Sequence, residues 1–395
     1  MTAVSPDTQQ PVARPRRLTF LPWMDGMRAI AVIAVMVFHE AISQPQLRIQ
    51  RWSAGGDLGV DVFFAISGFL ITTLLLQEAR ERGSIRFGAF YIRRARRLLP
   101  ALFVLLAALA VASLFDDAHH RRELLTRIVE TLFYVGNLVA ARSSQFRGML
   151  NHTWSLSTEE QFYLLWPAIL AVLILLARRW RPALLVGLTG FAAVAFLWPQ
   201  VAASRHWGFS RMYYAPDTRV APIALGAVLA GLWTSGLLPT SRLWVVIRRL
   251  AAAAGVVFIA LSFHNEKFID HLTQFGMNKM RVEYQNFSLI GLATVFILWE
   301  LLESTPHLGH RILSLPPLVA IGRISYGLYL WDAVIVLALN PAFTGVYGWP
   351  TLYIHIVTIF AIATLSWFLV ERHFVARRGA ARRPVLPVPP EAAPA

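Results

Sequence analysis

Apolar segments long enough to cross a lipid bilayer dominate this sequence of 395 residues. Hydrophobic residues make up 56% of the chain and charged residues only 15%, which is outside the range of ordinary soluble domains. A helix needs about 20 apolar residues to cross a bilayer, so we read ten spans. They are 20–43, 58–77, 98–115, 154–177, 183–203, 219–237, 243–263, 286–303, 316–339 and 350–371. The sequence therefore predicts an all-α fold, a polytopic membrane helical bundle of about ten transmembrane helices.

The arginines predict how this bundle lies in the membrane. With ten spans and the N-terminus inside, the arginines of 80–97, 178–181 and 377–383 all fall on the cytoplasmic side, as the positive-inside rule requires. The short apolar stretch 131–141 would reverse that placement if it were an eleventh span. We therefore assign 116–153 to an outer loop with a partly embedded helix, and we predict that both termini are cytoplasmic.

The net charge of +15 does not by itself indicate a nucleic-acid partner. In a membrane protein, basic loops fix the topology and contact anionic headgroups, so we expect membrane lipids and no nucleic acid among the partners. A minority of the arginines can still bind an anionic substrate. The sequence contains no cysteine, which excludes a thiolate nucleophile, a disulfide framework and a cysteine-based metal site.

Two short tails flank the predicted membrane domain, which we place at 20–372. Residues 1–19 are polar and contain prolines, so we expect a disordered cytoplasmic tail rather than a cleaved signal peptide. Residues 373–395 are first basic and then rich in proline and alanine, a composition typical of disordered segments. We expect neither tail to take part in chemistry.

The first predicted span carries an arginine and a histidine inside an apolar run. Arg28 and His39 are eleven positions apart, which is about 16 Å along a helix. An imidazole at such a depth is expensive and indicates a functional site, although a satisfied core histidine is the structural alternative. The zinc pattern H-E-x-x-H fails because Ser43 stands at its last position, so we predict no metal site.

Two further blocks place charges at the ends of spans. Asp61 falls just inside the second span, where it can pair with a cation. Arg93, Arg94 and Arg97 come directly before the third span. They can simply fix the topology, but Arg94 and Arg97 share one helical face and can bind phosphate oxygens bidentately.

Polar residues also open the fourth predicted span. Glu159, Gln161 and Tyr163 lie near its expected outer end, where carboxylates are costly to bury unless they are paired. Ser155 or Ser157 with the following carboxylates can instead form a helix cap. The stretch is therefore either part of a substrate site or a structural helix start.

Together these blocks resemble the acyltransferase-3 family of integral-membrane O-acyltransferases. The resemblance rests on the arginine and histidine eleven positions apart, on G-V-D-V-F-F-x-I-S-G-F-L-I, on R-R-x-x-R-L-x-P and on H-T-W-S-L-x-x-E-x-Q-F-Y-L-L-W-P. Blocks at 213–230 and 322–331 agree with it, and it extends from about 21 to 372. One position departs from the pattern, because Asp332 stands where the family commonly continues Y-L-W with histidine.

The resemblance implies an enzyme of the bacterial cell membrane that moves an acyl group, often acetyl, from acyl-CoA to a hydroxyl. The acceptor would be a sugar, a glycan or a glycosylated natural product such as a macrolide. His39 would be the general base, oriented by Glu40 or Asp61. The expected CoA-phosphate ligands are Arg28, Arg93, Arg94 and Arg97, and the expected substrate-binding residues are Trp154, Ser155, Glu159, Gln161, Tyr163, Arg219 and Tyr326.

The resemblance implies no permanently bound cofactor, because acyl-CoA would be a co-substrate. Some members of the family append a periplasmic hydrolase-like domain, and because the given sequence stops soon after the last span we expect none here. Buried charges mark substrate pathways as well as catalytic sites, so a transporter or flippase for a glycan or lipid-linked sugar is the alternative.

Overall fold

The computed structural model describes residues 18, 20–49, 53, 55–142, 148–205, 207–264, 279–340, 345 and 347–375, with the backbone alone for 279–285 and 375. The two predicted tails, 1–19 and 373–395, lie almost entirely outside the described residues. Within the described part every regular element is helical, which confirms the predicted all-α fold.

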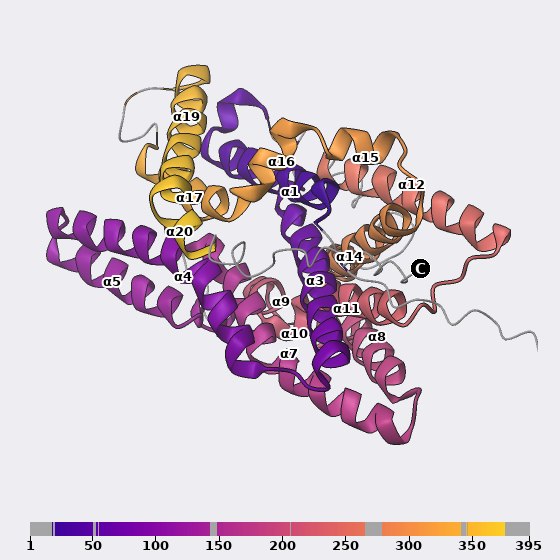
Figure 1. The fold of residues 1–395 in the computed structure, drawn as a ribbon. Coiled ribbons are helices and arrows are strands. Elements are labelled where there is room, and N and C mark those ends of the chain that lie inside the picture. Colours follow the sequence, from indigo (N-terminus) through magenta and orange to yellow (C-terminus); the bar gives the residue numbers. More distant parts are fainter. Residues whose placement is uncertain are drawn as a thin grey trace, which may run out of the picture.

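The helices follow one another with short connections (Figure 1). In chain order they are α1 (Pro22–Ser43), η1 (Pro45–Leu47), η2 (Gly56–Leu58), α3 (Gly59–Arg82), α4 (Phe87–Ala112), η3 (Ser113–Phe115), α5 (Ala118–Leu132), α6 (Gly136–Arg142), η4 (Asn151–Thr153), α7 (Trp154–Arg179), α8 (Ala183–Ser204), α9 (Phe209–Tyr214), α10 (Pro216–Arg219), α11 (Ala221–Thr234), α12 (Arg242–His264), α14 (Lys279–Glu303), α15 (Leu308–Leu313), α16 (Pro316–Arg323), α17 (Ser325–Ala338), α19 (Trp349–Ser366), η5 (Trp367–Glu371) and α20 (Arg372–Val375).

Eight of the described helices are long and apolar enough to cross a membrane, and two bent helix pairs raise that number to ten if each pair is one span. The protein is therefore an integral membrane protein. The expected span 316–339 is one of the bent pairs, with α16 and α17 at 70° to each other. The expected span 219–237 is only the short helix α11, which has 14 residues.

The stretch that we assigned to an outer loop forms the other bent pair. Helices α5 and α6 lie at 116° to each other, so they do not continue as one straight span. Tyr134 adopts a φ of 53°, in the left-handed region, which ends α5 just before α6 begins.

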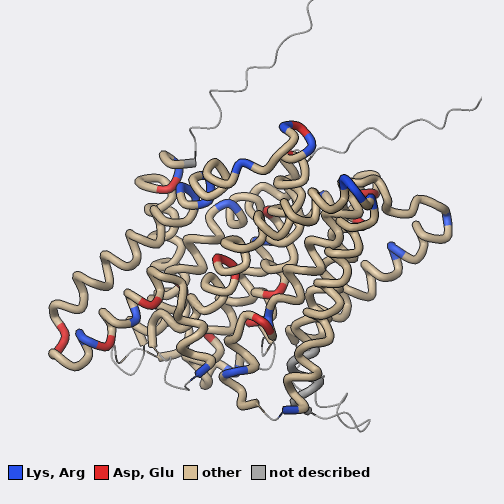
Figure 2. Tube along the Cα trace, turned by 90° about the horizontal axis from the view of Figure 1, so that it is seen from below, with Lys and Arg blue, Asp and Glu red and all other residues tan. Residues whose placement is uncertain are grey.

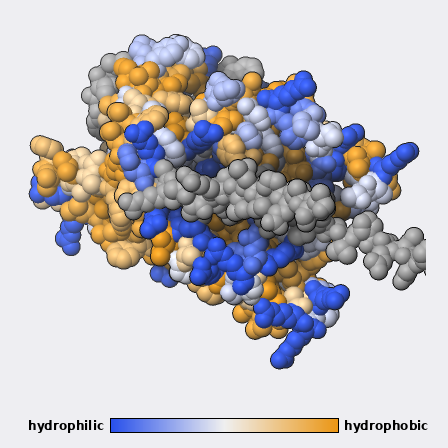
Figure 3. Space-filling view, in the orientation of Figure 1, coloured by the Kyte–Doolittle hydropathy of each residue, from blue (hydrophilic) through white to orange (hydrophobic). Residues whose placement is uncertain are grey.

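Charged and apolar residues separate as a bilayer requires. Figure 2 shows most of the charged residues at the ends of the helices, with a smaller group inside the bundle. Figure 3 shows hydrophobic surface over the flank that α4 and α5 form. Large apolar side chains such as Leu164, Val172 and Val194 are exposed on α7 and α8, where lipid can cover them.

Helix α3 is the centre of the bundle. Of its most apolar stretch 72% is buried, against 22% for α7, α8, α12 and α19. It packs closely on α11, because Gly68 and Gly226 let the two backbones approach. Helix α1 lies along α3 and also contacts α16 and α17, so residues of the first span face the second half of the chain (Figure 1).

We predict that Gly68→Ala destabilises the fold. The added Cβ would lie 1.9 Å from the carbonyl oxygen of Ile223, so the α3 and α11 backbones would have to separate. Overpacking of this kind typically costs about 1–3 kcal/mol. The thermal unfolding midpoint in detergent should fall, whereas Gly190→Ala, with nothing within 4 Å of its added Cβ, should not lower it. Equal midpoints for the two variants would contradict this packing argument.

Candidate active site

The imidazole of His39 lies near the end of α1 and lines a cavity of about 570 Å³, here called the histidine cavity. Its Nδ1 donates a hydrogen bond of 2.6 Å to Oδ2 of Asp332, on α17. The side chain of His39 is 20% exposed and that of Asp332 is fully buried. A carboxylate that binds Nδ1–H leaves the Nε2 lone pair available to take a proton, which is the arrangement of a general base.

Neither carboxylate that we expected to orient His39 contacts it. Glu40 accepts hydrogen bonds of 2.9 and 3.1 Å from His355, on α19, and one of 2.9 Å from Gln44. Successive helix residues point about 100° apart, so Glu40 faces α19 while His39 faces the cavity. Asp61 instead forms a fully buried ion pair of 3.1 Å with Arg219. The carboxylate that holds the His39 ring is Asp332.

Arginines gather in a second cavity of about 280 Å³, here called the arginine cavity. Its lining contains five arginines but only two carboxylates, Asp25 and Glu371, so positive charge is in excess. Asp25 lies 3.9 Å from Arg28 and 4.0 Å from Arg323. The five arginines are Arg28, Arg93, Arg96, Arg97 and Arg323.

A third cavity of about 190 Å³, here called the connecting cavity, lies between these two. It shares Arg28, Arg97 and Tyr326 with the arginine cavity, and Val60 and Tyr329 with the histidine cavity. The three cavities therefore adjoin one another in series between the arginines and His39.

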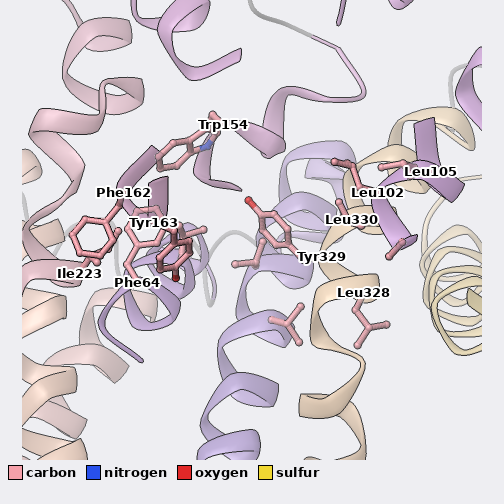
Figure 4. Close-up of a cluster of buried hydrophobic side chains, with 14 of the residues drawn as sticks. Phe64, Leu102, Leu105, Trp154, Phe162, Tyr163, Ile223, Leu328, Tyr329 and Leu330 are labelled. Atoms are coloured by element: carbon pink, nitrogen blue, oxygen red, sulfur yellow. The ribbon is translucent and has the colours of Figure 1, made fainter. Parts of the chain in front are cut away.

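Helix α17 runs beside this series of cavities. Tyr326, Tyr329 and Asp332 are spaced three positions apart on it, so they lie on one face. Tyr326 lines the arginine cavity and the connecting cavity, and Tyr329 lines the connecting cavity and the histidine cavity. Asp332 binds His39. Figure 4 shows Tyr329 between the aromatic group of α7 and the leucines of α17. Its hydroxyl donates to the carbonyl of His152 at 2.6 Å and lies 2.6 Å from Ser155 Oγ.

The expected phosphate ligands Arg93 and Arg94 are already paired with carboxylates. Arg94 donates to Glu160 at 2.7 Å, and its guanidinium lies 3.4 Å from the ring centre of Tyr163. Arg93 donates to Glu78 at 3.0 Å. Arg94 and Arg97 do line the connecting cavity together. Arg94 is paired with a carboxylate, whereas Arg97 forms no ion pair among the described residues.

The residues expected to bind substrate from the fourth span lie at two different depths. Trp154 lines the histidine cavity, whereas Ser155, Glu159 and Tyr163 line the connecting cavity with Arg28 and Arg97. Glu159 therefore lies in the same cavity as two of the arginines. Nine helical positions from Trp154 to Tyr163 correspond to about 13 Å, so the motif extends from one cavity to the next.

Two other expected substrate ligands have structural partners. Gln161 donates to the carbonyl of Tyr134 and to Asn137, both at 2.8 Å, and it does not line the three cavities described above. Arg219 is fully buried against Asp61, and its guanidinium lies 3.4 Å from the ring centre of Phe287.

The structure also adds residues that the sequence reasoning missed. Asp332 was noted only as a departure from the family pattern. His152 lies with its ring centre 6.3 Å from that of His39, and it belongs to a block that we had quoted without assigning it a role. Asp57 lines the histidine cavity, and nothing in the sequence marked it apart from its position before the second span.

Fold and site together define an integral membrane protein in which adjoining internal cavities lie between a group of arginines and a histidine–carboxylate pair. The comparisons assign the chain to a family: residues 21–371 match the sequence profile described as an acyltransferase domain. The protein belongs to the acyltransferase-3 family, which confirms the resemblance.

Several curated proteins are similar to the chain. A Staphylococcus aureus (strain COL) protein provisionally named an O-acetyltransferase is 32% identical over 91% of this chain and 58% of its own length. The peptidoglycan O-acetyltransferase OatA of Listeria monocytogenes is 32% identical over 89% of this chain and 55% of its own. The O-acetyltransferase OatA of Staphylococcus aureus (strain NCTC 8325 / PS 47) is 31% identical over 88% and 55%. The chain thus spans somewhat more than half the length of these relatives. No solved structure matches it.

We predict that Asp61 acts through its ion pair with Arg219. Asp61→Asn would remove the carboxylate that is ion-paired with a fully buried guanidinium, and breaking such a pair typically costs about 3–5 kcal/mol. Chemical denaturation in detergent should show this loss, and the double variant Asp61→Asn/Arg219→Met should recover much of it. If Asp61→Asn is as stable as the wild type, the pair does not stabilise the fold.

Proposed function

We propose that the protein is a membrane O-acyltransferase that moves a short acyl group, such as acetyl, from acyl-CoA to a hydroxyl. The acceptor is a sugar, a glycan or a glycosylated natural product such as a macrolide. The observation that carries this proposal is the series of cavities from the arginines to the His39–Asp332 pair. The names of the relatives, which refer to O-acetylation, support acetyl as the transferred group.

The arginine cavity is suited to the phosphates of acyl-CoA. Five arginines against two carboxylates leave positive charge for a polyanionic ligand, and guanidinium groups bind phosphate oxygens bidentately. Arg93 and Arg94 donate to Glu78 and Glu160, which lie outside the lining of this cavity. Arg97 forms no ion pair among the described residues and is the best candidate. Arg28 and Arg323, which share the one carboxylate of Asp25, come next. Under the predicted topology this cavity faces the cytoplasm.

The thioester arm would then extend through the connecting cavity toward His39. Arg28 and His39 are about 16 Å apart along α1, so a long flexible arm is needed between bound phosphates and the reacting carbonyl. Tyr329 and Val60 form the wall between the last two cavities, so the arm would pass beside them. The acceptor would occupy the larger histidine cavity.

In the proposed reaction a single proton moves from the acceptor hydroxyl to His39 and then to the sulfur of CoA. His39 Nε2 takes the proton of the acceptor hydroxyl while the oxygen attacks the thioester carbonyl carbon. The carbon–sulfur bond breaks, the proton passes from His39 to the sulfur, and the products are an ester and free CoA. Asp332 holds the ring and stabilises the imidazolium that forms between the two steps.

We predict that His39→Ala strongly lowers the rate of transfer while the protein still inserts and folds. General base catalysis contributes about 10²- to 10⁴-fold, so turnover in proteoliposomes with acetyl-CoA should fall by that factor. Asp332→Asn should lower kcat by at least about 10-fold with little change in KM, because it removes the charge that stabilises the imidazolium. Normal turnover by a folded His39→Ala variant would contradict the proposal.

The same preparation separates two chemical routes. We favour direct transfer in a ternary complex over a covalent acyl-histidine relay. Incubation with labelled acetyl-CoA but no acceptor should therefore leave His39 unlabelled. A labelled acyl group trapped on His39 would contradict direct transfer and favour the relay.

We predict that Arg97→Gln raises KM for acetyl-CoA about 10-fold or more, since a hydrogen bond to a charged group typically contributes about 1.5–3 kcal/mol. The same variant should leave KM for acetyl-pantetheine, which lacks the nucleotide phosphates, unchanged. Arg86→Gln is the matched control, because Arg86 is exposed and outside the arginine cavity. An equal rise with both donors would show that Arg97 does not bind the phosphates.

The series of cavities also fits the alternative, a transporter or flippase for a glycan or lipid-linked sugar. Free CoA distinguishes the two functions. A transporter moves intact substrate without consuming a thioester, whereas an acyltransferase releases one CoA for each ester formed.

A further inference from the structure

The walls of the histidine cavity combine aromatic rings with a single carboxylate. Among the described residues that line it, Asp57 is the one acidic residue, and neither arginine nor lysine takes part. Asp57 precedes α3 and accepts a hydrogen bond of 3.1 Å from the hydroxyl of Tyr213. The aromatic residues of the lining are Phe38, Trp154, Phe209, Tyr213, Tyr214, Phe287 and Tyr329.

The charge of Asp57 is not matched within its own cluster. The neighbouring cation is Arg219, and the ion pair of Arg219 is with Asp61, at 3.1 Å and fully buried. Because Asp57 also interacts electrostatically with Arg219, two carboxylates share one guanidinium, and one negative charge is left when both are ionised and His39 is neutral. Removing a carboxylate partly from water costs free energy, and a nearby cation lowers that cost.

The aromatic rings around this carboxylate already stabilise one cation. The guanidinium of Arg219 lies 3.4 Å from the ring centre of Phe287, 4.9 Å from that of Trp154 and 5.0 Å from that of Tyr213. The same three residues line the histidine cavity. Aromatic faces next to a carboxylate form the environment that binds ammonium groups in proteins.

From these contacts we infer that the acceptor carries a protonated amino group, as in an amino sugar or a natural product that bears one, and that Asp57 with the surrounding rings binds this ammonium. The inference rests on the proposed function and narrows its acceptor class. A neutral sugar could also hydrogen-bond to Asp57, but it would leave the negative charge of the cavity uncompensated.

Binding the amine as ammonium also explains transfer to oxygen. An ammonium has no lone pair, so it cannot attack the thioester, whereas a hydroxyl of the same molecule can. The new bond joins that oxygen to the acyl carbon, the carbon–sulfur bond breaks, and the hydroxyl proton reaches the CoA sulfur through His39. The ammonium keeps its protons throughout.

The first test needs no variant and no acyl donor. Two probes, an alkyl glucosaminide with a free amine and its N-acetyl counterpart, differ in charge but present the same ring hydroxyls. Binding to the protein in lipid nanodiscs is measured by calorimetry at a pH where the amine is protonated. We expect the amine to bind about 10-fold more tightly, as a desolvated cation–π contact next to a carboxylate allows. Equal or tighter binding of the N-acetyl probe, or no binding of the amine, overturns the inference.

Variants then locate the preference. Asp57→Asn should bind both probes equally, and Asp57→Glu should restore the preference for the amine. Asp116→Asn removes a carboxylate that is exposed and outside the cavity, so it should behave as the wild type. A folded Asp57→Asn protein that still prefers the amine overturns the assignment to Asp57.

Failure of the proposed function would look different. Release of CoA from acetyl-CoA in the presence of the amine probe measures transfer independently of binding. Selective binding of the amine without CoA release would contradict the acyltransferase proposal and leave the cation site standing. CoA release at equal rates with both probes would support the acyltransferase proposal and contradict the cation site.

Discussion

The hydrogen bond between His39 and Asp332 joins the first span to a helix almost 300 positions later in the chain. Helix α1 must lie directly along α17 for the two groups to meet. The break between α16 and α17 permits this, since α16 can pack on α1 while α17 turns by 70° to run beside it. The same pairing places Tyr326 near Arg28 and Tyr329 between them and His39. This one contact thus fixes both the orientation of the His39 ring and the course of the cavities.

Most of the fold was predictable because a bilayer leaves few alternatives to helices of spanning length. Where the prediction and the structure differ, the cause is local. Ile324 lies between two apolar helices that read as one continuous run, since a bend changes no hydropathy. Helix α11 is short, and apolar neighbours at both ends extended the run that we assigned to it. Tyr134 ends its helix with a left-handed φ, and a tyrosine in the sequence gives no indication of such a backbone conformation.

The site was predictable in part, for a reason that differs between its residues. His39, Arg28 and Arg97 stand out because ionisable groups in apolar runs need an explanation. Which carboxylate binds which cation depends on helix packing, and periodicity carries no such information. Glu40 adjoins His39 in sequence but binds His355, and Asp61 binds Arg219. The carboxylate that binds His39 is that of Asp332. Arg94 and Arg97 look alike in the motif, yet among the described residues only Arg94 forms ion pairs with carboxylates.

The two ends of the series of cavities differ in their charged residues, and this asymmetry would have consequences for both proposed substrates. The arginine cavity has five arginines against two carboxylates, whereas Asp57 is the acidic residue among the described lining of the histidine cavity. A polyanionic donor would be attracted at the first and repelled at the second, whereas a cationic acceptor would experience the reverse. Each substrate would then be confined to its own side without a moving gate. If the donor is acyl-CoA, as we propose, its uncharged thioester arm is the part that could extend past Tyr329 to His39, where the two substrates would meet.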